Sequence, residues 1–182
     1  GQGDPGAQLL AVRRAVYALG RSTALAEGCP AGPEPLAAPV PPAQVAAAIA
    51  AATVLGQTAD GKQILLASCT ADSPLLHELG RLRELTFRQV GEGTGRSRDL
   101  DDFDLHYQHI VIWDATAQRI AGAYRIMRGA QALARRGLGG LYSASLFRYS
   151  DDAIPRIAVG LELGRSFVVP DYWGSRSLDY LW

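Results

Sequence analysis

The sequence predicts an α/β domain that follows a smaller helical segment. Residues 61–182 alternate between strand-like and helical patterns, in the order strand, helix, loop, two strands, irregular segment, strand and helix. The two central strand-like runs are joined by a short turn, which indicates an antiparallel hairpin. Residues 1–60 are rich in alanine and proline and contain almost no aromatic residues, so we expect a domain boundary near residue 60.

Composition and charge exclude several classes of protein. The 182 residues suit one domain with an appendage, and a hydrophobic fraction of 48% is enough for a core. The formal net charge is zero, so a general attraction to nucleic acid is not expected. Cys29 and Cys69 lie far apart without metal-type spacing, which favours reduced thiols in a reducing compartment. The longest apolar run, from Ala46, is too short to span a bilayer, so we expect a cytoplasmic protein and leave open contact with the inner membrane surface.

The first 60 residues are expected to form two helices joined by a linker. An apolar stripe of Leu9, Leu10, Val12, Val16 and Leu19 predicts a helix over residues 7–26. Residues 27–42 hold six prolines, which is typical of an extended linker. Residues 43–56 are rich in alanine and predict a second helix.

The remaining residues predict strands and helices with clear signals at their ends. Residues 62–68 indicate a buried strand, and residues 72–91 a helix that Ser73 can cap, Pro74 can start and Gly91 can end. Strands are expected over residues 106–113, 119–128 and 156–170, and a loop with a short helix over residues 134–147. A helix begins after Gly174 and the sequence stops at Trp182, so we expect a chain that lacks its C-terminal part.

The hairpin allows a hypothesis about which side chains meet. If Trp113 pairs with Arg119, then Tyr107 faces Arg125 across the two strands and His109 lies on the same face. A shift of one residue would undo this arrangement. His109 by itself is either a packed strand residue or a member of a site.

Four aspartates crowd the stretch SRDLDDFDLHYQH, residues 97–109. Asp99, Asp101, Asp102 and Asp104 could form a metal loop, a solvated turn or the acidic half of a site that holds a cation. A calcium loop is disfavoured because Phe103 falls at a ligand position and Asp104 falls where glycine is needed. The preceding GEGTG, residues 91–95, follows a helix and matches neither phosphate-loop fingerprint.

The stretch LELGRSFVV, residues 161–169, places two charged residues inside an apolar strand. Burying Glu162 and Arg165 is costly unless they are paired or functional. A regular strand would point them to opposite faces, whereas a bulge near Gly164 would bring them to one face. They form either a structural ion pair or a catalytic carboxylate with an orienting arginine.

Five motifs in this order resemble a known family. They are Arg83 with Phe87, then Asp99, Asp101 and Asp104, then His109, then Tyr124 with Arg125, and finally Leu161 to Arg165. Together they resemble the acyl-carrier-protein-dependent branch of the GNAT superfamily of N-acyltransferases. The similarity is strongest to the ornithine N-acyltransferases, often labelled hemolysin-like, and weaker to the acyl-homoserine lactone synthases. Asp99 and Gly164 depart from the latter, which carry glutamate and serine at these positions.

The resemblance implies a fold and roles for residues. It implies a mixed, mostly antiparallel sheet flanked by helices, with the acyl-phosphopantetheine of acyl carrier protein held along the strand that contains Glu162, and with no metal and no tightly bound cofactor. Glu162 would be the base and Arg165 its catalytic partner. The amino-acid substrate would meet Arg83, Phe87, Asp99, Asp101, Asp104, His109 and Arg125. The donor would meet Phe167, Val168, Val169, Gly174, Ser175 and Arg176.

The implied reaction moves a fatty or 3-hydroxyacyl chain from acyl carrier protein to the α-amine of an amino acid, with ornithine as the expected acceptor. One alternative is a synthase of acyl-homoserine lactones or of other N-acyl amino acids. Another is a non-catalytic domain that only binds the carrier protein or a membrane surface. Arg128, Arg135, Arg136 and Arg148 are either a docking patch for the acidic carrier protein or solvated surface charge.

Overall fold

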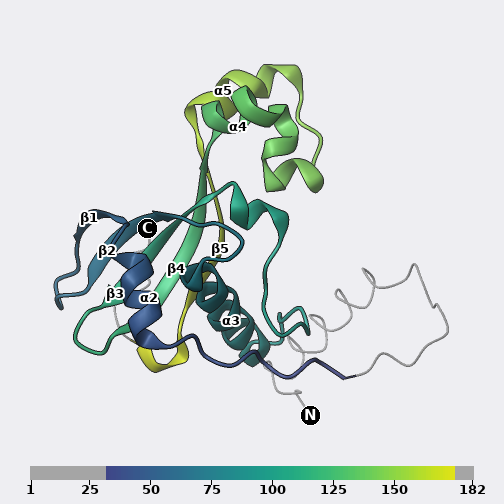
Figure 1. The fold of residues 1–182 in the computed structure, drawn as a ribbon. Helices are drawn as coiled ribbons and strands as arrows, with labels where there is room; N and C mark the ends of the chain where they lie inside the picture. Colours follow the sequence, from purple (N-terminus) through teal and green to yellow (C-terminus); the bar gives the residue numbers. More distant parts are fainter. Residues whose placement is uncertain (1–31, 175–182) are drawn as a thin grey trace, which may run out of the picture. The chain divides into compact units, whose positions relative to one another are not determined.

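A five-stranded antiparallel sheet lies at the centre of the computed structural model, which describes residues 32–174 (Figure 1). Its strands follow one another in sequence order, and every neighbouring pair is antiparallel. They are β1 (Thr53–Gln57), β2 (Gln63–Ser68), β3 (Gln108–Asp114), β4 (Arg119–Arg128) and β5 (Leu161–Val168). The fold is therefore the α/β, mostly antiparallel class that the sequence predicts.

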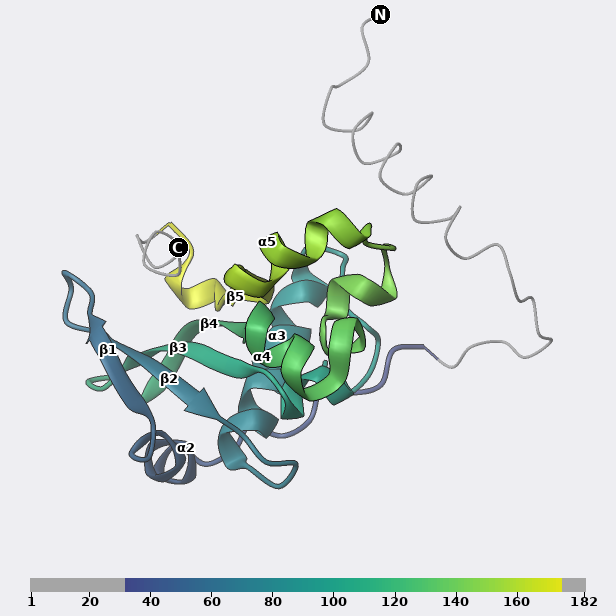
Figure 2. The same ribbon diagram turned by 90° about the horizontal axis from the view of Figure 1, so that it is seen from above.

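Within the described residues, four helices accompany the sheet: α2 (Pro42–Ile49), α3 (Pro74–Gln89), α4 (Gly129–Arg136) and α5 (Ile154–Val159). α2 and α3 pack on one face of the sheet, where their apolar residues join the main core with side chains of β2, β3 and β4 (Figure 1). α4 and α5 lie beside each other where β4 ends and β5 begins (Figure 2). Short 3-10 turns cover Asp102–Leu105, Gly137–Gly140, Tyr142–Ser145, Asp151–Ala153 and Pro170–Tyr172.

The helix α3 confirms the prediction over residues 72–91. Ser73 occupies the N-cap position and Pro74 begins the helix, although the Ser73 hydroxyl makes no capping hydrogen bond. Gly91 follows the C-cap residue with a φ of 78°, a conformation that glycine adopts without strain. Leu75, Leu79 and Leu82 are buried on the face toward the sheet.

The region before residue 60 differs from the prediction. The helix expected over residues 43–56 ends at Ile49, and Thr53–Gln57 forms β1, which pairs with β2. Pairing with β2 outweighs the helix propensity of the preceding alanines. A compact unit begins at Pro33, so the boundary expected near residue 60 falls inside the β1–β2 hairpin. The predicted helix over residues 7–26 lies outside the described residues.

The described part of the proline-rich linker is irregular, and it is attached to the domain. The backbone N–H groups of Glu34 and Ala37 donate to the carbonyl oxygens of Gly95 and Ser97, at 2.8 and 3.1 Å. The Val40 N–H donates to the Glu78 carboxylate at 3.0 Å. These bonds fix the segment beside α3 and its following loop.

The strand expected over residues 156–170 begins later than predicted. Its first residues form α5, whose first turn contains Pro155, and Gly160 then leads the chain into β5. Proline suits the first turn of a helix, which explains the early part of this difference. The short helix expected within residues 134–147 begins at Gly129 as α4 and is followed by 3-10 turns.

The hairpin register also differs from the hypothesis. Arg119 pairs with Asp114 rather than with Trp113, and an irregularity next to Trp113 shifts the register again. As a result His109, and not Tyr107, lies directly opposite Arg125. Tyr107 precedes β3, yet its ring still lies 5.2 Å from the Arg125 guanidinium.

Candidate active site

The loop that carries the aspartates is shaped by its own side chains. Asp101 accepts a hydrogen bond from the Phe103 N–H at 2.9 Å, and Asp104 accepts one from the Asp101 N–H at 2.9 Å. This reciprocal pair is a capping box, here on the 3-10 turn Asp102–Leu105. The aspartate spacing therefore determines the local backbone conformation before any tertiary contact is considered.

Arg83 of α3 holds this loop through four hydrogen bonds. Its guanidinium donates two hydrogen bonds to the Asp104 carboxylate, at 2.8 and 3.1 Å, and two to the Asp99 carbonyl oxygen, at 2.5 and 3.1 Å. Arg83 is 2% exposed and Asp104 is 1% exposed. A forked arginine–carboxylate pair that is shielded from water in this way fixes both partners tightly.

Two further arginines complete the charge balance of the loop. Arg125 of β4 donates to Asp101 at 2.5 Å and lies 3.3 Å from an Asp104 oxygen. Arg165 of β5 lies 3.3 Å from Asp99 and 3.7 Å from Asp101. Three arginines thus face three aspartates, whereas Asp102 is exposed. The cluster is an ion-pair network, and its aspartates do not form an uncompensated acidic surface.

The pKa values of the buried Asp99 and Asp104 carboxyl groups are shifted in opposite directions. Burial is the largest influence on the pKa of Asp104, but Arg83, the hydrogen bonds and Arg125 outweigh it and hold that pKa below its usual value. Burial also dominates for Asp99, where the charges of Arg83 and Arg165 do not outweigh it, so its pKa is raised. The difference follows from hydrogen bonding, because the Asp99 oxygen that faces both arginines has no hydrogen-bond partner among the described residues.

Glu162 is held by groups from two other segments. Its carboxylate accepts hydrogen bonds from the backbone N–H groups of Tyr142 and Ser143, at 3.0 and 2.7 Å, and from the Tyr107 hydroxyl. Burial and the hydrogen bond to Glu162 raise the pKa of Tyr107, which keeps its hydroxyl protonated as the donor. Glu162 therefore fastens the turn Tyr142–Ser145 to β5.

A bulge in β5 brings Glu162 and Arg165 to the same site. Gly164 pairs with Arg125 and Phe167 with Ala123, so one extra β5 residue lies between these two pairs. Arg165 has a φ of 55°, a left-handed conformation that is strained for arginine, and strained residues of this kind cluster at functional sites. The bulge proposed near Gly164 is present, although the left-handed residue is Arg165.

The bulge opens beside a pocket of about 340 Å³. Its walls include Phe87 of α3, Arg125 of β4, Glu162 and Arg165 of β5, and the rings of Tyr107 and Tyr142. The Arg125 guanidinium lies 5.2 Å from each tyrosine ring and 5.6 Å from that of Phe103, so aromatic rings and carboxylates together enclose it. A carboxylate, a partly exposed arginine and apolar rings thus meet at one edge of the described sheet.

The comparisons with known proteins agree with this geometry. The family model described as acetyltransferase (GNAT) domain matches residues 82–182, more than half of the chain. The chain belongs to the GNAT family. The match covers the second half of α3, the aspartate loop and β3 to β5, which together contribute the residues that line the pocket.

Curated relatives of this GNAT chain are named as acyltransferases of two amino acids. The glycine N(alpha)-acyltransferase of Phocaeicola vulgatus is 36% identical over 61% of this chain and 38% of its own length. The L-ornithine N(alpha)-acyltransferase of Brucella abortus is 35% identical over 55% of this chain and 40% of its own length. The chain thus spans about two-fifths of the length of these relatives. No solved structure matches the chain.

Not every residue implied by the resemblance to the GNAT family lies in the pocket. Phe167 is buried in the core, and Val169 lines a different cavity. Val168 is partly buried, Gly174 is exposed, and Ser175 and Arg176 lie outside the described residues. His109 is buried behind the loop, where its Nε2–H donates to the Asp104 carbonyl oxygen at 3.0 Å. This hydrogen bond indicates that His109 helps to hold the aspartate loop in position.

Other residues of the candidate site have weak sequence signals or none. Tyr107 was a candidate only through the hairpin hypothesis, and Tyr142 and Ser143 contribute backbone N–H groups, which any residue would supply. Their contact with Glu162 joins positions about twenty residues apart through irregular turns. Periodicity does not detect such contacts.

The glycine-rich loop binds a carboxylate of the protein itself. Glu84 of α3 is fully buried and accepts hydrogen bonds from the Thr94 N–H, the Thr94 hydroxyl and the Gly95 N–H at 2.7 to 2.9 Å, and from Arg88 at 2.7 Å. Burial opposes ionisation of Glu84, but these donors outweigh it and lower its pKa. The loop is therefore occupied, in agreement with the absence of a phosphate-loop fingerprint.

Residues 32–174 contain neither a metal-binding cluster nor a membrane-spanning helix. No three or more histidine, cysteine, aspartate or glutamate side chains within that range are grouped so as to hold a metal ion. No helix in it is long and apolar enough to cross a membrane.

His109 should make the stability of the domain depend on pH. Burial lowers the pKa of His109, with help from the charges of Arg83 and Arg125 and against the effect of Asp104. The unfolded chain therefore binds this proton more readily, so the free energy of unfolding should fall as the pH drops below about 6.5. The slope from this group is at most about 1.4 kcal/mol per pH unit. Urea unfolding measured across this range checks it.

The matched control for His109→Gln is His77→Gln, at a partly buried histidine of α3 outside the site. We expect His109→Gln to flatten the pH dependence below about pH 6.5, and His77→Gln controls for the loss of a histidine elsewhere in the domain. Equal slopes in wild type and His109→Gln would show that His109 does not titrate differently in the folded state.

Proposed function

We propose that this chain contains the catalytic centre of an amino-acid Nα-acyltransferase, which moves a fatty acyl chain from a thioester to an α-amine. The observation that supports it most is the convergence of Glu162 and Arg165 in one pocket at the β5 bulge. The names of the curated relatives support the amino-acid acceptor. A purely structural ion pair would not need a bulge that opens a pocket beside both side chains.

The chemistry requires a neutral amine and a polarised thioester. The amine nitrogen attacks the carbonyl carbon, the C–N bond forms, the C–S bond breaks, and the thiol leaves. Glu162, directly or through a water, takes the proton that the amine loses and returns it to the departing sulfur. Among residues 32–174 no strand pairs with the outer edge of β5, so its N–H groups on that side are suited to polarise the carbonyl oxygen.

Arg165 is the arginine best placed to meet the α-carboxylate of the acceptor. Its side chain is 27% exposed, whereas that of Arg125 is 1% exposed, and both line the pocket. Arg165 is also the more weakly engaged of the two, with its aspartate contacts at 3.3 and 3.7 Å. A substrate carboxylate can therefore bind it in a forked geometry at lower cost.

Ornithine and glycine are the two candidate acceptors, and the charge balance of the site bears on the choice between them. A cationic side chain could approach Glu92 and Glu162, which both line the pocket. The aspartates that were expected to attract this cation are already neutralised by Arg83, Arg125 and Arg165, which favours an acceptor without side-chain charge. The two relatives named as glycine N(alpha)-acyltransferases also favour an acceptor without side-chain charge.

Acyl carrier protein is the proposed donor. Arg128, Arg135, Arg136 and Arg148 are all exposed in the described structure, as an acidic docking partner requires. Screening of these charges should make the apparent KM for the carrier protein rise with salt concentration.

Incubating the chain with acyl carrier thioester and a panel of amino acids, followed by mass spectrometry, tests the proposal. We expect an Nα-acyl amide as the product. Comparing ornithine with glycine identifies the preferred acceptor. S-adenosylmethionine tests the lactone alternative, and acyl-coenzyme A tests the alternative donor. If no amide forms with any acceptor while the carrier protein or a membrane surface binds tightly, the domain is a non-catalytic binding module.

A further inference from the structure

A cavity of about 510 Å³ lies beside the last turn of α4. Side chains that can donate hydrogen bonds reach it from the end of β2, from the start of β3 and from α4. They are Ser68, His106, Gln108, Gln131, Arg135 and Arg136, and we call this cavity the arginine pocket. It shares one residue, the buried Tyr107, with the pocket that contains Glu162, so the two are neighbouring but separate.

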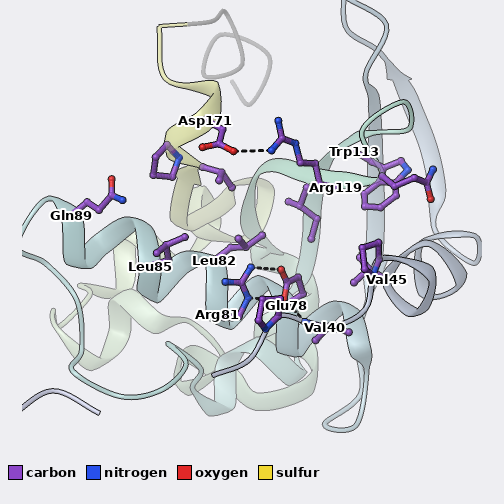
Figure 3. Close-up of a pocket in the computed structure, with 16 residues that line it drawn as sticks. Val40, Val45, Glu78, Arg81, Leu82, Leu85, Gln89, Trp113, Arg119 and Asp171 are labelled. Atoms are coloured by element: carbon purple, nitrogen blue, oxygen red, sulfur yellow. Dashed lines mark hydrogen bonds and ion pairs between the residues drawn. The ribbon is translucent and has the colours of Figure 1, made fainter. Parts of the chain in front are cut away.

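The positive charge of the arginine pocket is not compensated by the described part of the chain. Arg135 and Arg136 are exposed, and neither forms an ion pair within residues 32–174. No aspartate or glutamate of that range lines the pocket. Figure 3 shows the opposite arrangement at a cavity of about 320 Å³ beside α2 and α3, where charged side chains pair two by two, as Arg81 does with Glu78. An anion is therefore the ligand that complements the arginine pocket.

Helix stability explains only part of this arrangement. Arg135 and Arg136 lie in the last turn of α4, where positive charge stabilises a helix. That effect does not require a cavity, nor amide and hydroxyl groups from two other segments. The turn Gly137–Gly140 also fixes the base of Arg136, because a Cβ at residue 140 would lie 3.1 Å from the Arg136 Cβ. Glycine permits this close approach, which sets the direction in which Arg136 leaves the helix.

The donors of the arginine pocket suit a phosphate group better than a carboxylate. A phosphate ester presents more oxygens than a carboxylate and carries up to two negative charges, which two forked guanidinium groups can meet. Leu105, Met127 and the Tyr107 ring form an apolar part of the wall. This part suits an uncharged organic group attached to the phosphate.

We propose that the arginine pocket binds a phosphate ester, with Arg135 and Arg136 on the phosphate oxygens and the organic group against Leu105 and Met127. A soluble phosphate ester and the headgroup of an anionic phospholipid are the two sources of this chemistry. The inference goes beyond the proposed acyltransferase and does not depend on it, because binding is measured without acyl donor or acceptor.

Calorimetric titration of the whole chain with glycerol 3-phosphate at constant ionic strength is the first test. We expect saturable binding to one site, at least about tenfold tighter than the binding of acetate. Acetate binding of equal affinity would overturn the assignment to phosphate. Absence of binding up to about 10 mM, together with no binding to vesicles that contain phosphatidylglycerol, would overturn the site itself.

Charge-removing variants test the location of the site. Arg135→Gln and Arg136→Gln should each weaken binding about tenfold, because each removes charge-assisted hydrogen bonds. Arg148→Gln is the matched control, since it removes the same charge at an exposed arginine that does not line the pocket. It should change the Kd by less than about twofold. All three positions are exposed, and circular dichroism checks that the variants fold. Equal losses in the three variants would show diffuse attraction and remove the pocket.

Vesicle sedimentation distinguishes the two sources. Binding to vesicles with phosphatidylglycerol, but not to phosphatidylcholine alone, supports the headgroup if Arg135→Gln reduces it and Arg148→Gln does not. Binding of glycerol 3-phosphate without binding to vesicles supports the soluble ester. Vesicle binding that is insensitive to Arg135 and Arg136, without binding of the soluble ester, overturns the proposal.

Arg135 and Arg136 also belong to the patch proposed to dock acyl carrier protein, so the two proposals need separate readouts. A raised KM for the carrier protein in Arg135→Gln, Arg136→Gln and Arg148→Gln alike, with no binding of phosphate esters, retains the docking patch and removes the pocket. Binding of phosphate esters without any amide formation supports the pocket and removes the proposed reaction.

Discussion

Replacing Asp104 by asparagine is expected to lower the free energy of unfolding by about 3–5 kcal/mol. Asp104 is 1% exposed and is the forked partner of Arg83 as well as a neighbour of Arg125. Without its charge, two buried guanidinium groups lose their main compensation. The substitution also disturbs the capping box, in which an Asp104 oxygen accepts the Asp101 N–H. Urea unfolding followed by circular dichroism measures the loss.

Two neighbouring aspartates are the controls for Asp104→Asn. Asp99→Asn should cost less, because burial already raises the pKa of Asp99 and its charge is a net burden in the folded state. Asp102→Asn, at an exposed position, should stay within about 0.5 kcal/mol of wild type. Equal losses for Asp104→Asn and Asp102→Asn would show that the ion-pair network contributes nothing.

The pH dependence of the Asp104 contribution has a definite sign. Because its pKa is depressed in the folded state, the stabilisation is complete above the ordinary value of 3.8 and is lost as the pH falls through the lower folded value. The difference between wild type and Asp104→Asn should therefore narrow below about pH 4.

The sequence predicts the elements whose signals are local. α3 follows from its leucine spacing together with Ser73, Pro74 and Gly91, and β4 was predicted with the ends that the structure shows. The helix expected to reach residue 56 failed because pairing of Thr53–Gln57 with β2 is a tertiary effect. The register of the β3–β4 hairpin failed for a related reason, since an irregularity beside Trp113 leaves no trace in residue type.

The sequence predicts only part of the arrangement of the aspartate loop. One sequence-based alternative makes these aspartates the acidic half of a site that holds a cation, and in the structure the cations are the protein's own Arg83, Arg125 and Arg165. The sequence does not predict the partner of each arginine, because the three arginines come from different elements. Nor does it predict that the charges balance, which changes the expected attraction for a cationic substrate.

The role of Glu162 depends on a contact that the sequence did not show. Three donors from Tyr107, Tyr142 and Ser143 hold its carboxylate, so the side chain has a structural contribution in addition to any catalytic one. A substitution at Glu162 therefore changes both the proton acceptor and the attachment of the turn. Separating these effects requires a second variant that loosens the contact and retains the carboxylate.

Glu162→Gln is expected to reduce kcat by about 10²–10⁴-fold, the range for loss of a general base. Tyr107→Phe removes one donor to Glu162 and keeps the carboxylate, so it should reduce kcat by less than about tenfold. Thermal unfolding reports any loosening of the turn in both variants. If the two variants lose the same activity and the same stability, Glu162 serves to hold the turn, and the proton of the amine must be taken by another group or by solvent.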